Sequence, residues 1–290
     1  MNKNNYHTHT TRCYHASGKD EEYVKAAIKA GIKELGFSDH TPWHYDSSFK
    51  ATMRMDENQL DGYIESILSL KEKYKDQISI LVGLECEYFE KYIPWLKQML
   101  KDKKIDYIIL GNHYYKTDEL HDYFGTPVDE FHLKAYVDQC IQAIDSGLYS
   151  YIAHPDLVYY DKDSKLYQEE MSRLCAYAKE KDMPLEFNLL GFMTHRHYPN
   201  NAFWKIANHY KNKAIIGFDA HSPDALLKDD IYQQAFNYLS SLDVELIDTI
   251  QTLKKIRIFF LIFYFTSSIA CLPVKCSIII STQQRAFHSL

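Results

Sequence analysis

The chain has 290 residues, 46% of them hydrophobic, which is enough to bury one large core or two smaller ones. Its net charge of −6 provides no basic excess that would attract nucleic acid or an anionic membrane, so we expect a small-molecule partner. The six cysteines form no C-x-x-C pair, and the polar N-terminus leaves no room for a signal peptide. We therefore expect a reduced, cytoplasmic protein of unknown oligomeric state.

Two histidines stand two residues apart near the start of the chain. In an extended strand, His7 and His9 leave the same face and can bind one ion. Such a pair is common by chance, and a histidine at a strand end is more often a hydrogen-bonded core residue than a metal ligand. The pair therefore gains weight only if other strands also end in residues of the ligand type.

Strands and helices are predicted to alternate along the rest of the chain. Strands are expected over 34–38, 78–84, 106–111, 149–153, 184–188 and 214–218, which are short apolar runs. Helices are expected over 20–32, from a cap at 56–59 to beyond 68, and over 92–101, 129–145 and 165–181. With the strand at His7 this gives seven strand-then-helix units without a Gly/Ser-rich linker, which favours a parallel sheet with covering helices in one domain, residues 1–255.

A long connection and a series of terminal side chains mark one rim of this predicted sheet. The loop over 41–55 is too long for a minimal connection and is expected to lie over a site. In closed parallel α/β barrels the active site forms at the C-terminal ends of the strands. All predicted strands except the sixth, 184–188, end in candidate ligands there, and the full set is His7, His9, His15, His40, Glu85, His113, His154, Asp219 and His221.

This set combines imidazoles and carboxylates without thiolates. Such donors suit zinc, iron or manganese and argue against a cysteine-based structural zinc site. One catalytic ion takes three or four protein ligands, so the number of candidates implies two or three divalent ions, which Glu85 can bridge. Clustered ions lower the pKa of a bound water and clamp phosphoryl oxygens, so phosphoester hydrolysis is the leading predicted chemistry.

The ordered motifs resemble the polymerase and histidinol phosphatase (PHP) family, and most closely its monofunctional histidinol-phosphatase branch. They are His7-Thr8-His9, His15, Ser38-Asp39-His40, Gly83-Leu84-Glu85, Gly111-Asn112-His113, Ala153-His154-Pro155-Asp156 and Asp219-Ala220-His221, and the resemblance covers about residues 5–250. It implies a distorted (β/α)7 TIM-like barrel with a metal site at the C-terminal ends of the strands. It also implies hydrolysis of L-histidinol phosphate to L-histidinol and phosphate in histidine biosynthesis.

The resemblance further implies roles for single residues. His7, His9, Glu85 and Asp219 would hold a first ion, Glu85, His113 and His154 a second, and His15, His40 and His221 a third. Of these, His7, His9, Glu85, His113 and Asp219 are the expected catalytic centre. Asp39, Glu87, Asn188 and His195 are candidates for supporting or substrate contacts at the rim.

Substrate binding is predicted to involve arginines, because a guanidinium fork suits phosphate oxygens. The candidates are Arg54 in the long loop and Arg196 after the sixth strand, with His44 and His197 beside them; the alternative for each arginine is a solvated surface charge. Related phosphatases often carry an arginine directly after the Gly-hydrophobic pair of the later loop. Here Gly191-Phe192 is followed by Met193, so Arg196 would have to take that role.

Other functions stay open at this point. A phosphoesterase of the same scaffold could act on a nucleotide, sugar or tyrosine phosphate, although an exonuclease would be expected to show a basic groove. A barrel-type amidohydrolase commonly uses a carboxylated lysine at a strand end, and no predicted strand here ends in lysine. A non-catalytic metal-binding module would be expected to have lost some of the ligand positions.

The sequence changes character after about residue 255. Residues 258–274 are 17 uncharged residues interrupted by Pro273, which is the lower limit for spanning a bilayer. The interpretations of the hydrophobic and polar tail, 256–290, are a membrane anchor or a non-native or disordered end.

Overall fold

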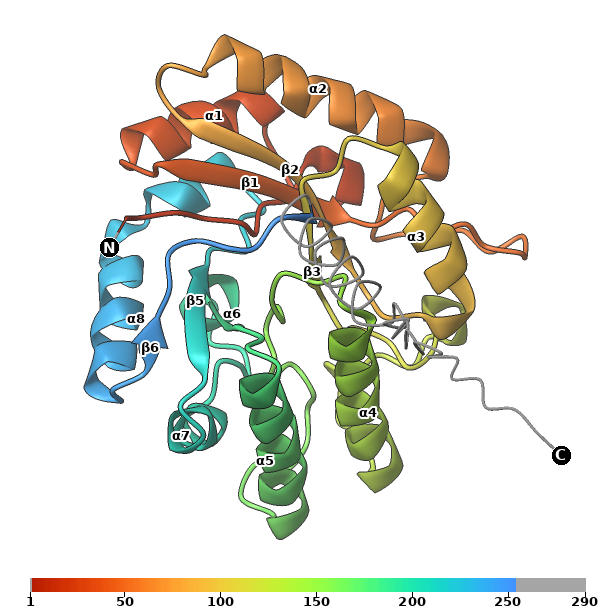
Figure 1. Cartoon of the computed structure of the whole chain (residues 1–290), viewed down its shortest axis with the longest axis vertical. Helices are drawn as coiled ribbons and strands as arrows, with labels where there is room; N and C mark the ends of the chain where they lie inside the picture. Colours follow the sequence, from red (N-terminus) through yellow and green to blue (C-terminus); the bar gives the residue numbers. More distant parts are fainter. Residues whose placement is uncertain (1, 254–290) are drawn as a thin grey trace, which may run out of the picture.

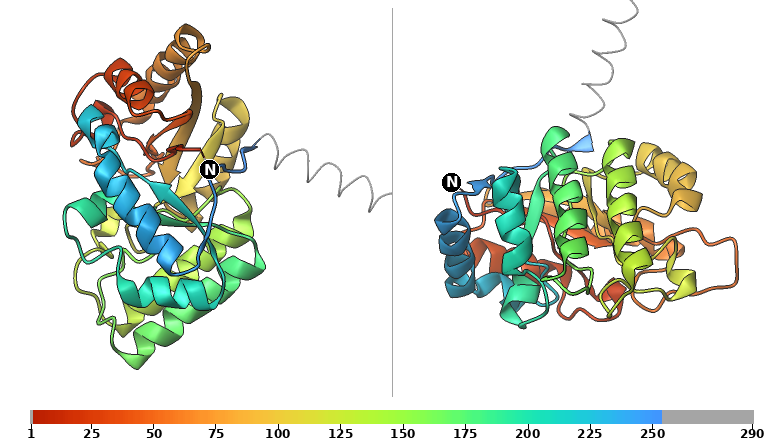
Figure 2. Two further views of the ribbon diagram at one scale, coloured as in Figure 1. Left: turned by 90° about the vertical axis from the view of Figure 1, so that its left-hand side faces the viewer. Right: turned by 90° about the horizontal axis from the view of Figure 1, so that it is seen from below.

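Parallel strands occupy the centre of the molecule, and helices surround them (Figures 1 and 2). The computed structural model describes residues 2–253. The strands are β1 (Glu34–His40), β2 (Ser79–Cys86), β3 (Tyr107–Leu110), β4 (Leu185–Asn188), β5 (Lys213–Gly217) and β6 (Glu245–Leu246). The helices are α1 (Asp20–Lys29), α2 (Leu60–Lys73), α3 (Ile93–Asp102), α4 (Glu130–Ser146), α5 (Lys165–Glu180), α6 (Leu189–Met193), α7 (Asn201–His209) and α8 (Asp229–Ser241). Short 3-10 helices cover Thr11–Cys13, Glu57–Gln59, Glu90–Tyr92, Asp118–Leu120 and Pro223–Leu227.

The strands form two parallel three-stranded sheets, ordered β1-β2-β3 and β4-β5-β6. Ile152 joins them, because it makes parallel bridges to Leu110 of β3 and to Leu185 of β4. The N-terminal segment makes further bridges, from Thr8 to Ala220 just after β5 and from residue 5 to β1. The predicted mixed α/β architecture with parallel strands and covering helices is therefore confirmed.

Two of the seven predicted strands, 6–10 and 149–153, contribute only isolated bridges. Just before the first, the Asn5 side-chain oxygen accepts the Phe218 backbone N–H at 2.9 Å, so a side chain replaces part of the backbone ladder. In the second, Ile152 donates to the Pro184 oxygen at 3.0 Å, and Ser150 and Ala153 donate to oxygens of β3 at 2.8 and 2.9 Å, so the segment is hydrogen-bonded on both sides although only Ile152 forms bridges. A closed seven-stranded barrel is thus not established among residues 2–253 and stays a prediction.

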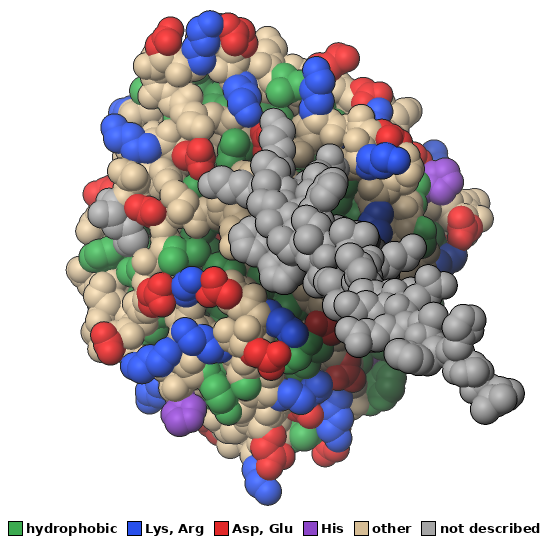
Figure 3. Space-filling view, in the orientation of Figure 1, with side chains coloured by type: hydrophobic (Ala, Val, Ile, Leu, Met, Phe, Trp, Pro, Cys, Tyr) green, Lys and Arg blue, Asp and Glu red, His purple; other side chains and the backbone are tan. Residues whose placement is uncertain are grey.

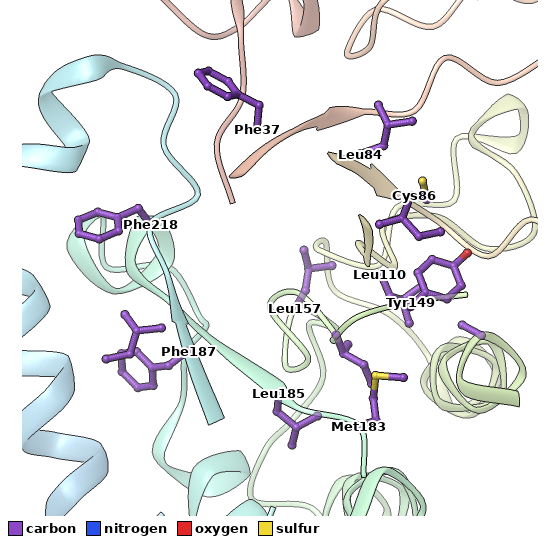
Figure 4. Packing of buried hydrophobic residues seen from close by; sticks show 14 of the residues in the cluster. Phe37, Leu84, Cys86, Leu110, Tyr149, Leu157, Met183, Leu185, Phe187 and Phe218 are labelled. Atoms are coloured by element: carbon purple, nitrogen blue, oxygen red, sulfur yellow. The ribbon is translucent and has the colours of Figure 1, made fainter. Parts of the chain in front are cut away.

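Alternating side chains place two hydrophobic clusters on opposite faces of the strands. Ile108 and Leu110 of β3 belong to the larger cluster, between strands and helices, and Tyr107 and Ile109 belong to the smaller one. Figure 4 shows members of the larger cluster projecting from several strands, among them Phe37, Leu84, Leu110, Leu185 and Phe187. The helices are held to the outside of the strands by this burial.

The smaller cluster lies on the inner face of the strands. Its buried members are Tyr6, Tyr107, Ile109, Tyr151, Ala153, Ile215 and Ile250. Tyr107 packs directly over Gly36 and Gly83, where an added Cβ would collide with its ring. Its hydroxyl donates to the backbone oxygen of Tyr6 at 2.7 Å, and so links β3 to the segment that carries His7 and His9.

The helix ends agree with the signals in the sequence. The backbone at Gly31, after α1, has φ +73°, and Gly147, which caps α4, has φ +65°. Only glycine adopts this left-handed conformation readily, which explains why both helices stop there. The loop over 41–55 contains no helix or strand, as predicted.

The face shown in Figure 3 carries acidic and basic side chains interspersed with one another. Within residues 2–253, no helix has both the length and the apolar character required to cross a membrane. The predicted tail, 256–290, lies outside the described residues.

Candidate metal centre

The predicted ligands come together at one end of the parallel strands. His7 and His9 lie in the N-terminal segment, His15 follows a 3-10 helix, and His40 and Glu85 belong to the ends of β1 and β2. The remaining four, His113, His154, Asp219 and His221, lie in the connections after β3, after Ile152 and after β5. Side chains separated by more than a hundred residues in the chain therefore meet at this rim.

Four ligand atoms surround one point in the first group. His7 Nε2 lies 3.2 Å from His9 Nε2 and 3.4 Å from Asp219 Oδ1. His9 Nε2 lies 3.2 Å from the same oxygen, and Glu85 Oε2 lies 3.5 Å from each imidazole nitrogen. This is the set that the family resemblance implies for a first ion.

The second oxygen of Glu85 faces a different pair of histidines. Glu85 Oε1 lies 2.9 Å from His154 Nε2 and 3.4 Å from His113 Nε2. The two oxygens of one carboxylate therefore point into two neighbouring groups of ligand atoms. This is the arrangement that a bridging carboxylate requires.

The third predicted group lies beside the first. The His15 ring is centred 4.7 Å from that of His221 and 5.6 Å from that of His40, and the His9 ring stacks on His221 at 4.1 Å. The sequence did not predict that buried Cys13 would join them. Its sulfur and one nitrogen each of His15 and His221 lie within 4.8 Å of one another.

Buried polar atoms without partners support a cation at this rim. Glu85 Oε2 and Asp219 Oδ1, which face the first group of histidines, and His40 Nδ1 beside them are all buried and have no hydrogen-bond partner. Leaving such atoms unpaired is costly, and metal coordination satisfies them. The donors, imidazole nitrogen and carboxylate oxygen, are those that divalent ions such as zinc prefer.

Burial keeps two of the histidines in the form that binds metal. Burial lowers the pKa of His40 to about 3, with a further contribution from the neighbouring His9, although Glu85 opposes the shift. Burial and His9 likewise lower the pKa of His221 to about 4. Both imidazoles are therefore neutral near pH 7 and offer a lone pair.

The carboxylates, in contrast, are held in their charged form. Burial alone would raise the pKa of Glu85, but His113, His7 and His40 lower it well below its usual range. Burial alone would also raise the pKa of Asp219, but His7, His9 and His221 together lower it well below its usual range. Buried anions of this kind favour a cation at the same place.

Carboxylates also lie next to Nδ1 of three of the candidate ligand histidines. Nδ1 of His7 lies 2.8 Å from Glu186 Oε1, and Nδ1 of His113 lies 3.1 Å from Glu87 Oε1. Nδ1 of His9 lies 3.5 Å from Asp39 Oδ1. A partner on Nδ1 fixes the ring and directs Nε2 toward the metal. The structure thus places Asp39 and Glu87 where supporting groups were expected.

Glu186 was missed from the sequence, because the sixth predicted strand was taken to supply no metal ligand and only Asn188, at its end, was considered as a supporting group. Its carboxylate also accepts the backbone N–H of His154 at 3.0 Å and the Asn188 side-chain N–H at 3.0 Å. On the neighbouring strand, Gly217 leaves the space that this side chain fills. The available signal was a glutamate between Leu185 and Phe187, since a charge inside a buried strand requires partners.

Asn188 and the backbone itself position two further ligands. The Asn188 side chain donates to Asp219 Oδ2 at 3.1 Å. Asp219 and His154 have φ values of +48° and +29°, which are unusual for residues other than glycine. Such conformations persist where surrounding contacts impose them, and they concentrate at functional sites.

A cavity of about 430 Å³ opens onto the candidate ligands. Its other lining residues are Met53, Tyr114, Tyr123, Leu157, Leu190, Arg196 and Tyr198. The volume lies in the range of small-molecule sites, and the wall combines one cation with aromatic and aliphatic groups. It can therefore accept a small anion that also carries an apolar part.

Of the four predicted substrate-binding residues, Arg196 lines this cavity, and its Nη1 donates to the Tyr198 hydroxyl at 2.7 Å. The prediction for Arg54 is corrected by the structure. Its side chain is only 1% exposed and is paired with Glu87 and Asp118, so it is not available to a phosphate. The sequence does not distinguish a buried arginine from a phosphate-binding one, because both occur in loops rich in polar residues.

His44 and His197, which were also predicted to bind substrate, lie outside the cavity. The side chain of His44 is 56% exposed and pairs with Glu57 at 2.7 Å. His197 faces the backbone oxygen of Leu157, and its ring stacks on Tyr159. Neither is among the residues that line the cavity. His195, with φ +52°, is exposed at the surface.

Known proteins resemble this chain in both sequence and structure. A probable histidinol-phosphatase from Deinococcus radiodurans is 29% identical over 233 residues, which covers 75% of this chain and 85% of the relative. The histidinol-phosphatase of Bacillus subtilis is 28% identical over 258 residues, covering 76% of this chain and 94% of the relative.

Two crystal structures share the fold. That of the putative histidinol phosphatase from Listeria monocytogenes has a TM-score of 0.65 and 20% identity, and covers 78% of this chain and 98% of its own. That of the histidinol phosphate phosphatase from Lactococcus lactis, complexed with zinc, L-histidinol and phosphate, has a TM-score of 0.63 and 19% identity, and covers 86% and 97%. The model of the PHP domain matches residues 5–189, more than half of the chain, and the chain therefore belongs to the PHP domain family.

Proposed function

We propose that this protein is a metal-dependent phosphomonoesterase that hydrolyses L-histidinol phosphate to L-histidinol and phosphate, a reaction of histidine biosynthesis. The observation that carries the proposal is the position of Glu85, whose two oxygens face two separate groups of ligand atoms next to a cavity. Relatives named histidinol-phosphatase align over most of their own length, which supports this substrate.

The proposed cofactor is a cluster of two or three divalent ions, zinc, manganese or iron. His7, His9, Glu85 and Asp219 would hold one ion and Glu85, His113 and His154 the next, with His15, His40 and His221 available for a third. Ions bound there would supply an activated water and neutralise charge on the phosphoryl oxygens. The catalytic role of His7, His9, Glu85, His113 and Asp219 is to hold this cluster.

Arg196 is the proposed phosphate-binding residue. Its guanidinium lines the cavity, and the Tyr198 hydroxyl accepts from Nη1, which orients the fork. A guanidinium donates two parallel hydrogen bonds to phosphate oxygens. Tyr114, Tyr123 and Leu157 on the cavity wall suit the flat ring of histidinol, because aromatic and aliphatic surfaces exclude water from it.

The test is phosphate release from L-histidinol phosphate by the purified protein, with and without added zinc or manganese. Nucleotide, sugar and tyrosine phosphates serve as competing substrates. We expect histidinol phosphate to be preferred and His113→Ala to abolish turnover. Arg196→Met is expected to raise KM roughly 10-fold or more, because a charged hydrogen bond to phosphate is lost.

His44→Ala is the matched control, because His44 lies outside the cavity, where it pairs with Glu57 and stacks on Trp95. It should leave both kcat and KM unchanged. If another ester were preferred, phosphoester hydrolysis would still be supported, but L-histidinol phosphate would be rejected as the substrate. Absence of turnover on every ester by the metal-loaded protein would reject the proposed function.

A further inference from the structure

Arg54 lies in the loop over 41–55 and is surrounded by acceptors. Its Nη2 donates to Glu87 Oε1 at 2.7 Å and its Nη1 to Glu87 Oε2 at 3.0 Å, which makes a two-point pair with the carboxylate. Nε donates to Asp118 Oδ2 at 3.0 Å, and Nη1 also donates to the backbone oxygen of Thr41 at 3.0 Å. A buried guanidinium with so many partners positions the groups around it.

Glu87 connects this arginine to the metal centre. Its Oε1 accepts from Arg54 and also lies 3.1 Å from Nδ1 of His113. Its Oε2 accepts from Trp43 Nε1 at 2.9 Å, and its backbone oxygen accepts from the Tyr149 hydroxyl at 2.7 Å. The carboxylate is therefore fixed by donors on several sides while it holds the imidazole of a candidate ligand.

Arg54 also joins the two ends of the loop over 41–55. Thr41, at the start of the loop, donates its backbone N–H and its hydroxyl to the Glu85 backbone oxygen at 2.9 and 3.0 Å. Arg54, at the far end, returns to the Thr41 oxygen. Its neighbour Met53 reaches the cavity wall, where its sulfur lies 3.2 Å from the Tyr114 hydroxyl. Arg54 thus contacts both the loop over 41–55 and Glu87, the carboxylate that holds the imidazole of His113.

We propose that Arg54 is a positioning residue that couples the loop over 41–55 to the imidazole of His113 through Glu87. Without the guanidinium, the buried Glu87 carboxylate loses its two-point partner and no longer holds His113 with Nε2 toward Glu85. The metal bound by that group is then released more readily. The inference rests on the proposed metal centre, and it does not depend on which phosphate ester is the substrate.

The experiment follows zinc transfer from the zinc-loaded full chain to a chromogenic chelator. The variants are Arg54→Met, Glu87→Gln and the double variant, and circular dichroism confirms that each is folded. We expect each single variant to release zinc about 10-fold faster than the unmodified chain. The double variant should match Glu87→Gln within about twofold, because both changes act through one carboxylate.

Arg173→Met is the matched control. Arg173 also pairs with two acids, Asp138 and Glu170, but on the surface of α4 and α5, so the zinc release rate should not change. Arg54→Lys keeps the charge without the fork, and its release rate should fall between those of the unmodified chain and Glu87→Gln. This variant also provides the test if Arg54→Met does not fold.

Zinc release from Arg54→Met or Arg54→Lys at the rate of the unmodified chain would overturn the proposal. So would a double variant whose increase in zinc release rate is the product of the two single increases. Zinc held equally by every variant would reject the role of Arg54 and leave the metal centre intact. Failure of the unmodified chain to bind zinc would instead reject the metal centre, and the inference with it.

Discussion

Glu186 contacts two residues of the candidate metal centre, although it is not itself a candidate ligand. It holds the His7 ring through Nδ1 and the backbone of His154 through its N–H. It belongs to β4, whose end carries no candidate ligand, so both of the ligand residues that it contacts lie in other segments. A single carboxylate therefore sets the direction of one imidazole and the path of the chain that presents a second.

We expect Glu186→Gln to weaken zinc binding by about 10-fold, because a neutral amide holds the His7 imidazole less firmly than a carboxylate. Competition with a chelator of known affinity measures the change. Glu180→Gln is the control, since Glu180 lies on the surface of α5 beside Lys181. Equal zinc affinity in Glu186→Gln and the unmodified chain would show that the His7 contact has no part in metal binding.

At the scale of the element, the sequence predicts most strands and helices, because apolar runs and glycine stop signals are local properties. It also predicts that His40, Glu85 and His113 converge, since they follow consecutive strands of one parallel sheet. It does not distinguish Arg54 from Arg196, because burial depends on which distant acids fold against a loop. Glu186 was missed for the same reason, since its partners come from other strands.

The loop after Ile152 and the start of α7 are joined by another buried acid. Asp156 Oδ2 accepts the backbone N–H of Asn200, the residue that caps α7, at 2.7 Å. Burial raises the pKa of Asp156 to about 7, even though this hydrogen bond opposes the shift. The folded state therefore favours the protonated carboxyl. Its contribution to stability is complete below the unfolded pKa, about 4, and is lost as the pH rises through 7.

We expect Asp156→Asn to remove this dependence on pH, because an amide keeps the acceptor for Asn200 and carries no charge. Relative to the unmodified chain, the variant should gain roughly 1–3 kcal/mol in free energy of unfolding at pH 8. Urea unfolding at pH 4.5 and pH 8 measures the difference. A gain of the same size at both values would mean that ionisation of Asp156 is not its cause.

At the scale of the whole molecule, the last described residues close the inner cluster against the N-terminal segment. Ile250 packs with Tyr6 and Tyr107, and the backbone N–H of Leu253 donates to the Asp106 oxygen at 2.8 Å. The family motifs predict the ordered ligands but not this packing, since no motif lies beyond residue 221. The proposed domain, 1–255, therefore needs its final segment for its core.

We expect a chain that ends after residue 255 to keep its zinc and its free energy of unfolding. A chain that ends after residue 246 should lose about 3–6 kcal/mol, because Ile250 and Leu253, 8% and 5% exposed, no longer bury their side chains. Urea unfolding and zinc content measure both. Equal stability of the two truncated chains would contradict the role given to this segment.

The pairing of Thr8 with Ala220 has a consequence for how the protein is made. His7 and His9 leave the ribosome more than 200 residues before Asp219 and His221, which lie beside them in the folded chain. At a synthesis rate of about 5–20 residues per second, roughly 10–40 seconds pass between the emergence of His7 and His9 and that of Asp219 and His221. During that interval the early histidines are exposed, unpaired metal-binding groups. In the proposed metal centre, ions would therefore meet the full set of ligands only after residues 219–221 have emerged, and the metal that the surroundings then supply would fill the site.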